Sequence, residues 1–106
     1  MGISVVPDSW SLHLMMIKLL IVIPSYNTGR LLETTVKEVL SETARPVWVV
    51  VDGSTDGSDR SILELASSED RLRVIVKEVN EGKGAGVRTA LLEAQKEHYT
   101  HALVMD

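Results

Sequence analysis

The sequence contains no cysteine and no phenylalanine, and aromatic residues make up only 4% of it. The absence of cysteine excludes disulfide scaffolds, thiolate zinc sites and cysteine nucleophiles, and it suits a reducing compartment. So few aromatic rings argue against a platform on which nucleic-acid bases stack. Basic residues are also in deficit, since 11 Lys and Arg against 15 Asp and Glu give a net charge of −4. We therefore expect no nucleic-acid partner, because such a surface repels phosphate backbones.

The chain also lacks a hydrophobic run long enough to cross a membrane. Its longest apolar-rich stretch, residues 12–23, is interrupted by His13 and Lys18, and a membrane span needs about 20 predominantly apolar residues. The 106 residues suffice for one domain at about 100–200 residues per domain. We expect residues 1–17 to form a leader or an extra edge segment, and residues 18–106 to form an α/β domain. Because the chain stops directly after the apolar run 102–105, we expect this domain to be truncated there.

Four apolar runs, at residues 19–23, 47–51, 72–76 and 102–105, alternate with three segments in which apolar residues recur at helical spacing. Continuous rather than alternating apolar runs predict strands that are covered on both faces, as in a parallel sheet. The helical segments centre on residues 31–40, 62–66 and 87–94, and we expect Asp56 to cap the second of them. The order β-α-β-α-β-α-β predicts a three-layer α/β/α domain with a mainly parallel sheet.

Ligands of open parallel sheets sit beyond the carboxyl ends of the strands. The residues just past the predicted strands, 24–27, 52–57, 78–86 and 106, are also the most polar and glycine-rich parts of the chain. The Gly-Lys-Gly-Ala-Gly run at residues 82–86 either binds phosphate at a helix amino end or forms a tight turn without a ligand. Asp52 ends a strand and can accept hydrogen bonds from a nucleobase or ribose. Asp106 ends the last strand and is a candidate metal ligand, although one carboxylate alone makes a poor site.

Taken together, these segments resemble the nucleotide-binding half of family 2 glycosyltransferases of the inverting GT-A type, most closely the dolichol- or polyprenyl-phosphate sugar transferases. Four segments carry the resemblance in order and spacing: V-I-P-S-Y-N at 22–27, V-V-D-G-S-T-D-G-S at 50–58, N-E-G-K-G-A-G-V-R-T-A at 80–90 and V-M-D at 104–106. From the first segment to the last, the resemblance extends over nearly all of residues 18–106. The resemblance implies a Rossmann-like, GT-A nucleotide-binding fold.

The resemblance also implies roles for individual residues. The nucleotide-binding residues would be Pro24, Tyr26, Asn27, Val50, Asp52, Gly53, Lys83 and Arg88. Asp106 would be the first acid of a metal motif that holds Mg2+ or Mn2+ on the donor diphosphate, and the general base would lie beyond the chain end. Two positions depart from the family pattern, because Val51 replaces the first Asp of a usual pair and Thr28 replaces a Glu that often follows Tyr-Asn. We expect the first departure to remove a carboxylate from the base pocket.

The expected function is therefore sugar transfer from a UDP- or GDP-linked donor to an acceptor such as a polyprenyl phosphate, with this chain forming the donor-binding portion. The alternative is a non-catalytic, truncated α/β module that binds nucleotide weakly or only self-associates through an exposed sheet edge. The family's donors place the protein in the cytoplasm or at the inner face of a membrane.

Overall fold

The computed structural model describes residues 16–105, so most of the predicted leader and Asp106 lie outside the described residues. Seven elements follow one another in the predicted alternating order: β1 (Leu19–Ser25), α2 (Arg30–Glu42), β2 (Val47–Asp52), α3 (Ser58–Ser68), β3 (Leu72–Lys77), α4 (Lys83–Lys96) and β4 (His101–Val104). No helix in this part of the chain is long and apolar enough to cross a membrane.

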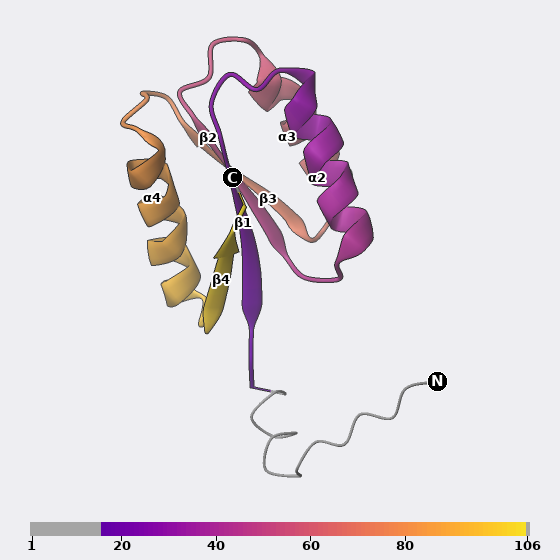
Figure 1. Ribbon diagram of the computed structural model, residues 1–106, viewed down its shortest axis with the longest axis vertical. Helices are drawn as coiled ribbons and strands as arrows, with labels where there is room; N and C mark the ends of the chain where they lie inside the picture. Colours follow the sequence, from indigo (N-terminus) through magenta and orange to yellow (C-terminus); the bar gives the residue numbers. More distant parts are fainter. Residues whose placement is uncertain (1–15, 106) are drawn as a thin grey trace.

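The four strands form one parallel sheet in the order β3-β2-β1-β4. Figure 1 shows α4 on one face of this sheet and α2 with α3 on the other. The predicted three-layer α/β/α architecture is therefore confirmed. Because all strands are parallel, their carboxyl ends meet at one edge of the sheet, which we call the carboxyl end, and the loops after β1, β2 and β3 lie side by side there.

The core has two parts, one on each face of the sheet. Alternate residues of β1 and β2 point to opposite faces, as strand geometry requires. Ile21, Ile23, Val49 and Val51 pack beneath α2 and α3. The other face packs beneath α4, where the buried residues are Leu20, Val22, Trp48, Val50, Ala90 and Ala94. The two central strands are thus covered on both faces, as their apolar runs predict.

The prediction of two covered faces is wrong for β4, and it holds only partly for β3. All four residues of β4 are exposed, and β3 alternates between buried, half-buried and exposed positions. Both strands lie at the edges of the sheet, whereas α4 packs against β1 and β2. An apolar run alone could not distinguish a central strand from an edge strand.

The helices begin where the sequence predicts, but the cap residue of α3 differs from the prediction. Gly82 is the N-cap residue of α4, as its glycine-rich segment suggests. The N-cap residue of α3 is Gly57, with φ of +81°, and not Asp56 as predicted. The Asp56 carboxylate accepts a hydrogen bond from the amide of Gly29, the N-cap residue of α2, at 2.9 Å. Asp56 therefore links the beginnings of two helices, which sequence spacing alone did not reveal.

Candidate functional site

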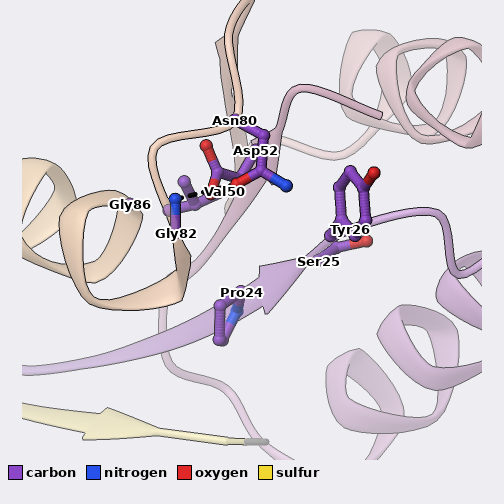
Figure 2. Close-up of a pocket in the computed structure, with 8 residues that line it drawn as sticks. All are labelled: Pro24, Ser25, Tyr26, Val50, Asp52, Asn80, Gly82 and Gly86. Carbon is purple, nitrogen blue, oxygen red and sulfur yellow. Dashed lines mark hydrogen bonds between the residues drawn. The ribbon is translucent and has the colours of Figure 1, made fainter. Parts of the chain in front are cut away.

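A pocket of about 310 Å³ opens at the carboxyl end of the sheet. Three chain segments build it: the end of β1, the end of β2, and the β3–α4 loop with the first turn of α4 (Figure 2). We call it the carboxyl-end pocket; its lining residues are Pro24, Ser25, Tyr26, Val50, Asp52, Asn80, Gly82 and Gly86. Its position is the one that parallel-sheet geometry predicts for a ligand.

Asp52 is the polar centre of the pocket. Only 4% of its surface is exposed, and its Oδ1 accepts one hydrogen bond, from the backbone N–H of Glu81 at 3.3 Å. Its Oδ2 accepts none from the residues that the structure describes. A buried carboxylate oxygen without donors is costly, since burial removes the water that would otherwise satisfy it. The pocket therefore suits a ligand that presents N–H or O–H groups to Asp52.

The wall formed by α4 comes close to the strands because it carries a glycine. A Cβ atom at Gly86 would lie 3.1 Å from Cγ1 of Val50, so any larger side chain would crowd the floor of the pocket. The first turn of α4 contains no acidic residue. The helix amino end therefore keeps its partial positive charge toward the pocket, which favours an anionic group nearby.

Gly53 joins the loop after β2 to the loop after β3. Its amide donates to the carbonyl of Lys77 at 2.7 Å. With φ of +68°, it is also so close to the next loop that a Cβ atom would lie 2.5 Å from the backbone nitrogen of Asn80. Only glycine fits this contact. The Asn80 side chain in turn accepts the amide of Gly82 at 2.8 Å, which fixes the approach to α4.

The structure brings half of the predicted nucleotide-binding residues together in the pocket: Pro24, Tyr26, Val50 and Asp52. Asn27 and Gly53 belong to the adjoining loops and are not among the lining residues, and neither is the exposed Arg88. The backbone of Lys83 begins α4 beside the pocket. Asp106, the predicted metal ligand, lies outside the described residues.

Four residues that line the pocket were not among the predicted site residues, namely Ser25, Asn80, Gly82 and Gly86. All four lie in segments that follow predicted strands and that carry the family resemblance, and Gly82 and Gly86 belong to the glycine-rich run at residues 82–86. The expectation that Val51 removes a carboxylate from the base pocket is wrong. Its side chain is 1% exposed and packs in the core beneath α2 and α3. A carboxylate at this position would not line the carboxyl-end pocket.

The described residues do not form a metal site by themselves. Residues 16–105 contain no group of three His, Cys, Asp or Glu side chains placed to hold an ion. Asp52 is the only carboxylate of this part of the chain that lines the pocket. A cation bound here would need ligands from outside the described residues or from the bound molecule.

Comparison with known proteins identifies relatives of this chain. Residues 20–106 match the sequence profile of Glycosyl transferase family 2. The chain is 31% identical over 81 residues to the glycosyltransferase GlyG of Streptococcus pneumoniae serotype 4, covering 74% of this chain and 27% of GlyG. It is 33% identical over 78 residues to TuaG of Bacillus subtilis (strain 168), a putative teichuronic acid biosynthesis glycosyltransferase, covering 71% of this chain and 31% of TuaG.

A solved structure agrees with these sequence relatives. The mannosyltransferase PcManGT from Pyrobaculum calidifontis, in complex with GDP-Man and Mn2+, superposes with a TM-score of 0.64 at 25% identity. The match covers 73% of this chain and 24% of the mannosyltransferase. This chain therefore spans less than a third of the length of each relative.

Proposed function

The chain belongs to glycosyltransferase family 2, and from this premise we propose that its carboxyl-end pocket binds the nucleoside of a nucleotide-diphospho-sugar donor. The chain would be the donor-binding portion of an enzyme that transfers the sugar to an acceptor. The relative whose structure contains GDP-Man supports a nucleotide-sugar donor for this fold.

The single observation that carries the proposal is the environment of Asp52. Its carboxylate is buried, and one of its oxygens accepts no hydrogen bond from the described residues. The N–H groups of a uracil or guanine base, or the hydroxyls of a ribose, would donate a hydrogen bond to this oxygen. Tyr26 offers an exposed ring at the rim, and Pro24 and Val50 add apolar surface. A volume near 310 Å³ is at the lower end of ligand pockets, about 300–1,000 Å³, so we assign to it the nucleoside alone.

We place the diphosphate near the amino end of α4. The helix dipole, the glycine-rich segment at residues 82–86 and the absence of an acidic residue in the first turn favour an anion there. Lys83 and Arg88 are the proposed cationic residues of this region, and Asp106 is the proposed ligand of an Mg2+ or Mn2+ ion. A bound divalent ion would stabilise the charge of the leaving nucleoside diphosphate.

The proposal extends to the type of donor, the class of acceptor and the place of the reaction. We propose a UDP- or GDP-linked donor, and a polyprenyl phosphate as the acceptor class. Such an acceptor would place the reaction at the inner, cytoplasmic face of a membrane. The general base that activates the acceptor would be supplied from outside these 106 residues.

Calorimetric titration of the 106-residue chain with UDP, GDP and their sugar conjugates, with and without Mn2+, tests the proposal. We expect saturable binding of one nucleotide type. The variant Asp52→Asn keeps an oxygen for the Glu81 amide but removes the second acceptor, so we expect it to weaken binding by about tenfold or more. The matched control is Glu64→Gln on α3, an exposed acid that does not line the pocket, and this variant should bind like the wild type. Equal affinity in all three proteins would contradict the proposal.

A second candidate function, self-association, is favoured by the exposure of β4. Its outer edge has no partner strand within residues 16–105. His101 and Met105 donate their amides to β1 and the residue before it. In a parallel ladder, Ala102 and Val104 therefore present their N–H and C=O groups outward. Antiparallel pairing of two copies around Leu103 would satisfy these groups and bury exposed apolar side chains.

Sedimentation equilibrium tests this second candidate. We expect a concentration-dependent dimer that Leu103→Lys dissociates. Leu31→Lys is the matched control, because Leu31 is an exposed leucine on α2, away from the edge. A wild-type protein that stays monomeric at all concentrations would exclude edge pairing.

A further inference from the structure

The loops that follow β1 and β2 are joined by reciprocal hydrogen bonds of one asparagine. The amide of Asn27 donates to Oγ of Ser54 at 2.9 Å, and Oδ1 of Asn27 accepts the amide of Thr55 at 2.7 Å. Asn27 has φ of +49°, a left-handed conformation that asparagine tolerates better than most residues. We call this pair of bonds the asparagine clasp.

Two further hydrogen bonds hold the β1–α2 loop on either side of the asparagine clasp. The Asp56 carboxylate accepts the amide of Gly29 at 2.9 Å, which ties the β1–α2 loop to the β2–α3 loop a second time. The hydroxyls of Ser25 and Thr28 are 2.7 Å apart and close the β1–α2 loop on itself. The backbone of residues 25–29 is therefore fixed on both sides of Tyr26.

Tyr26, in contrast, has no side-chain partner of its own. Its residue surface is 52% exposed, and its hydroxyl and ring make no hydrogen bond or ring contact with any described residue. Figure 2 shows its ring on the opposite side of the pocket from Gly82 and Gly86, with Asp52 between them. The position of the ring is thus set by the backbone on which it stands.

We propose that Asn27 is a positioning residue, whose clasp holds the Tyr26 ring against the nucleoside in the carboxyl-end pocket. The inference rests on the proposed function and deepens it. It gives Asn27 another role than the nucleotide contact that the resemblance implies, because its Oδ1 accepts the amide of Thr55 and thereby holds the loop that carries Tyr26. The nucleoside would then touch Tyr26 and Asp52, and Asn27 would act through Tyr26.

A double-mutant cycle between positions 26 and 27 separates the two roles. Asn27→Gly keeps access to the left-handed conformation but removes the Oδ1 acceptor, and Asn27→Asp keeps both. We expect Asn27→Gly to weaken nucleotide binding by about tenfold and Asn27→Asp to restore most of the affinity. In a Tyr26→Ala background, Asn27→Gly should cause little further loss, because the ring that it positions is gone. Additive losses would show direct contact by Asn27 and overturn the proposal.

Amide hydrogen exchange by NMR provides a readout that needs no nucleotide. We expect Asn27→Gly to lower the protection of the Thr55 amide, and Asn27→Asp to preserve it. The control is Thr43→Val, which removes a comparable side-chain acceptor for the amide of Arg45 in a distant loop and should change neither Thr55 protection nor affinity. Unchanged protection in Asn27→Gly would overturn the clasp. If the wild type binds no nucleotide, the proposed function fails and the exchange data alone decide whether the clasp exists.

Discussion

The two ends of the parallel sheet use polar side chains in different ways. At the amino end, charged and aromatic side chains form an ion pair and cation–π contacts with one another. The Arg73 guanidinium makes a two-pronged ion pair with the Glu97 carboxylate and lies 4.3 Å from the Trp48 ring centre. Lys18 lies over the ring of Tyr99, at 4.2 Å. In these five residues, which we call the amino-end cluster, each charged group has a partner within the cluster.

The loops around the carboxyl-end pocket are held in another way. Asn27 and Asp52 each accept a hydrogen bond from the backbone of a neighbouring loop, from the amides of Thr55 and Glu81 respectively. The loops are thereby fixed, while one oxygen of Asp52 and the ring of Tyr26 remain without a partner among the described residues. The amino-end cluster stabilises the fold, whereas the hydrogen bonds of Asn27 and Asp52 hold the loops around the pocket and leave functional groups available there.

The largest effect on this comparison is expected from Gly53→Ala. The left-handed conformation alone costs a side chain about 1–2 kcal/mol, and the new Cβ would also collide with the backbone of Asn80. We expect a loss of about 3 kcal/mol or more in the free energy of unfolding, measured by urea denaturation. Gly57→Ala is the control, since Gly57 has φ of +81° but its new Cβ would meet no atom within 4 Å. Equal losses in both variants would mean that the contact between the loops contributes nothing.

Arg73→Met should have a smaller effect, confined to the amino end. It removes both the ion pair with Glu97 and the cation–π contact with Trp48, and we expect a loss of about 1 kcal/mol in stability. Nucleotide affinity should stay at the wild-type value, because no residue of the amino-end cluster lines the pocket. Lys37→Met, which breaks the exposed pair with Glu33 on α2, is the control and should cost less. A change in affinity without a change in stability would refute the separation of the two ends.

The smallest expected effect is a pH dependence that arises from the same cluster. The hydrogen bonds from Arg73 lower the pKa of Glu97 below its usual value of 4.5. The unfolded chain therefore binds this proton first, so the stabilisation is present above pH 4.5 and is lost as pH falls through the folded pKa. Urea denaturation at about pH 6 and about pH 3 should show a smaller acid loss in Glu97→Gln than in the wild type. Glu64→Gln should retain the wild-type loss, and identical behaviour of all three would contradict the assignment.

Much of the fold could be predicted from local patterns. Apolar runs and helical spacing located the four strands and three helices of residues 16–105, and parallel-sheet geometry placed the pocket at the strand ends. The prediction failed where a neighbour distant in sequence decides the outcome. The run at β4 resembles that of β1, yet β4 is an exposed edge strand.

The site shows the same division. Pro24, Tyr26, Val50 and Asp52 could be predicted, because each stands at a strand end within a recognisable segment. The partner of Asn27 could not, because Thr55 is 28 residues away and reaches it only when β1 and β2 lie side by side. Similarly, the sequence around residue 56 suggested only a cap for α3 and gave no sign that the Asp56 carboxylate accepts the amide of Gly29 at the start of α2.

The order of the elements, the family and the segments that build the pocket thus follow from the chain alone, because they depend on periodicity and motifs within short stretches. Which residues of those segments face the pocket, and which hold the loops, follows only from the packed fold. Val51 and Asp52 are neighbours in the chain, but one is in the core and the other lines the pocket. That difference arises because adjacent strand residues point to opposite faces, and packing of the helices determines what each face meets.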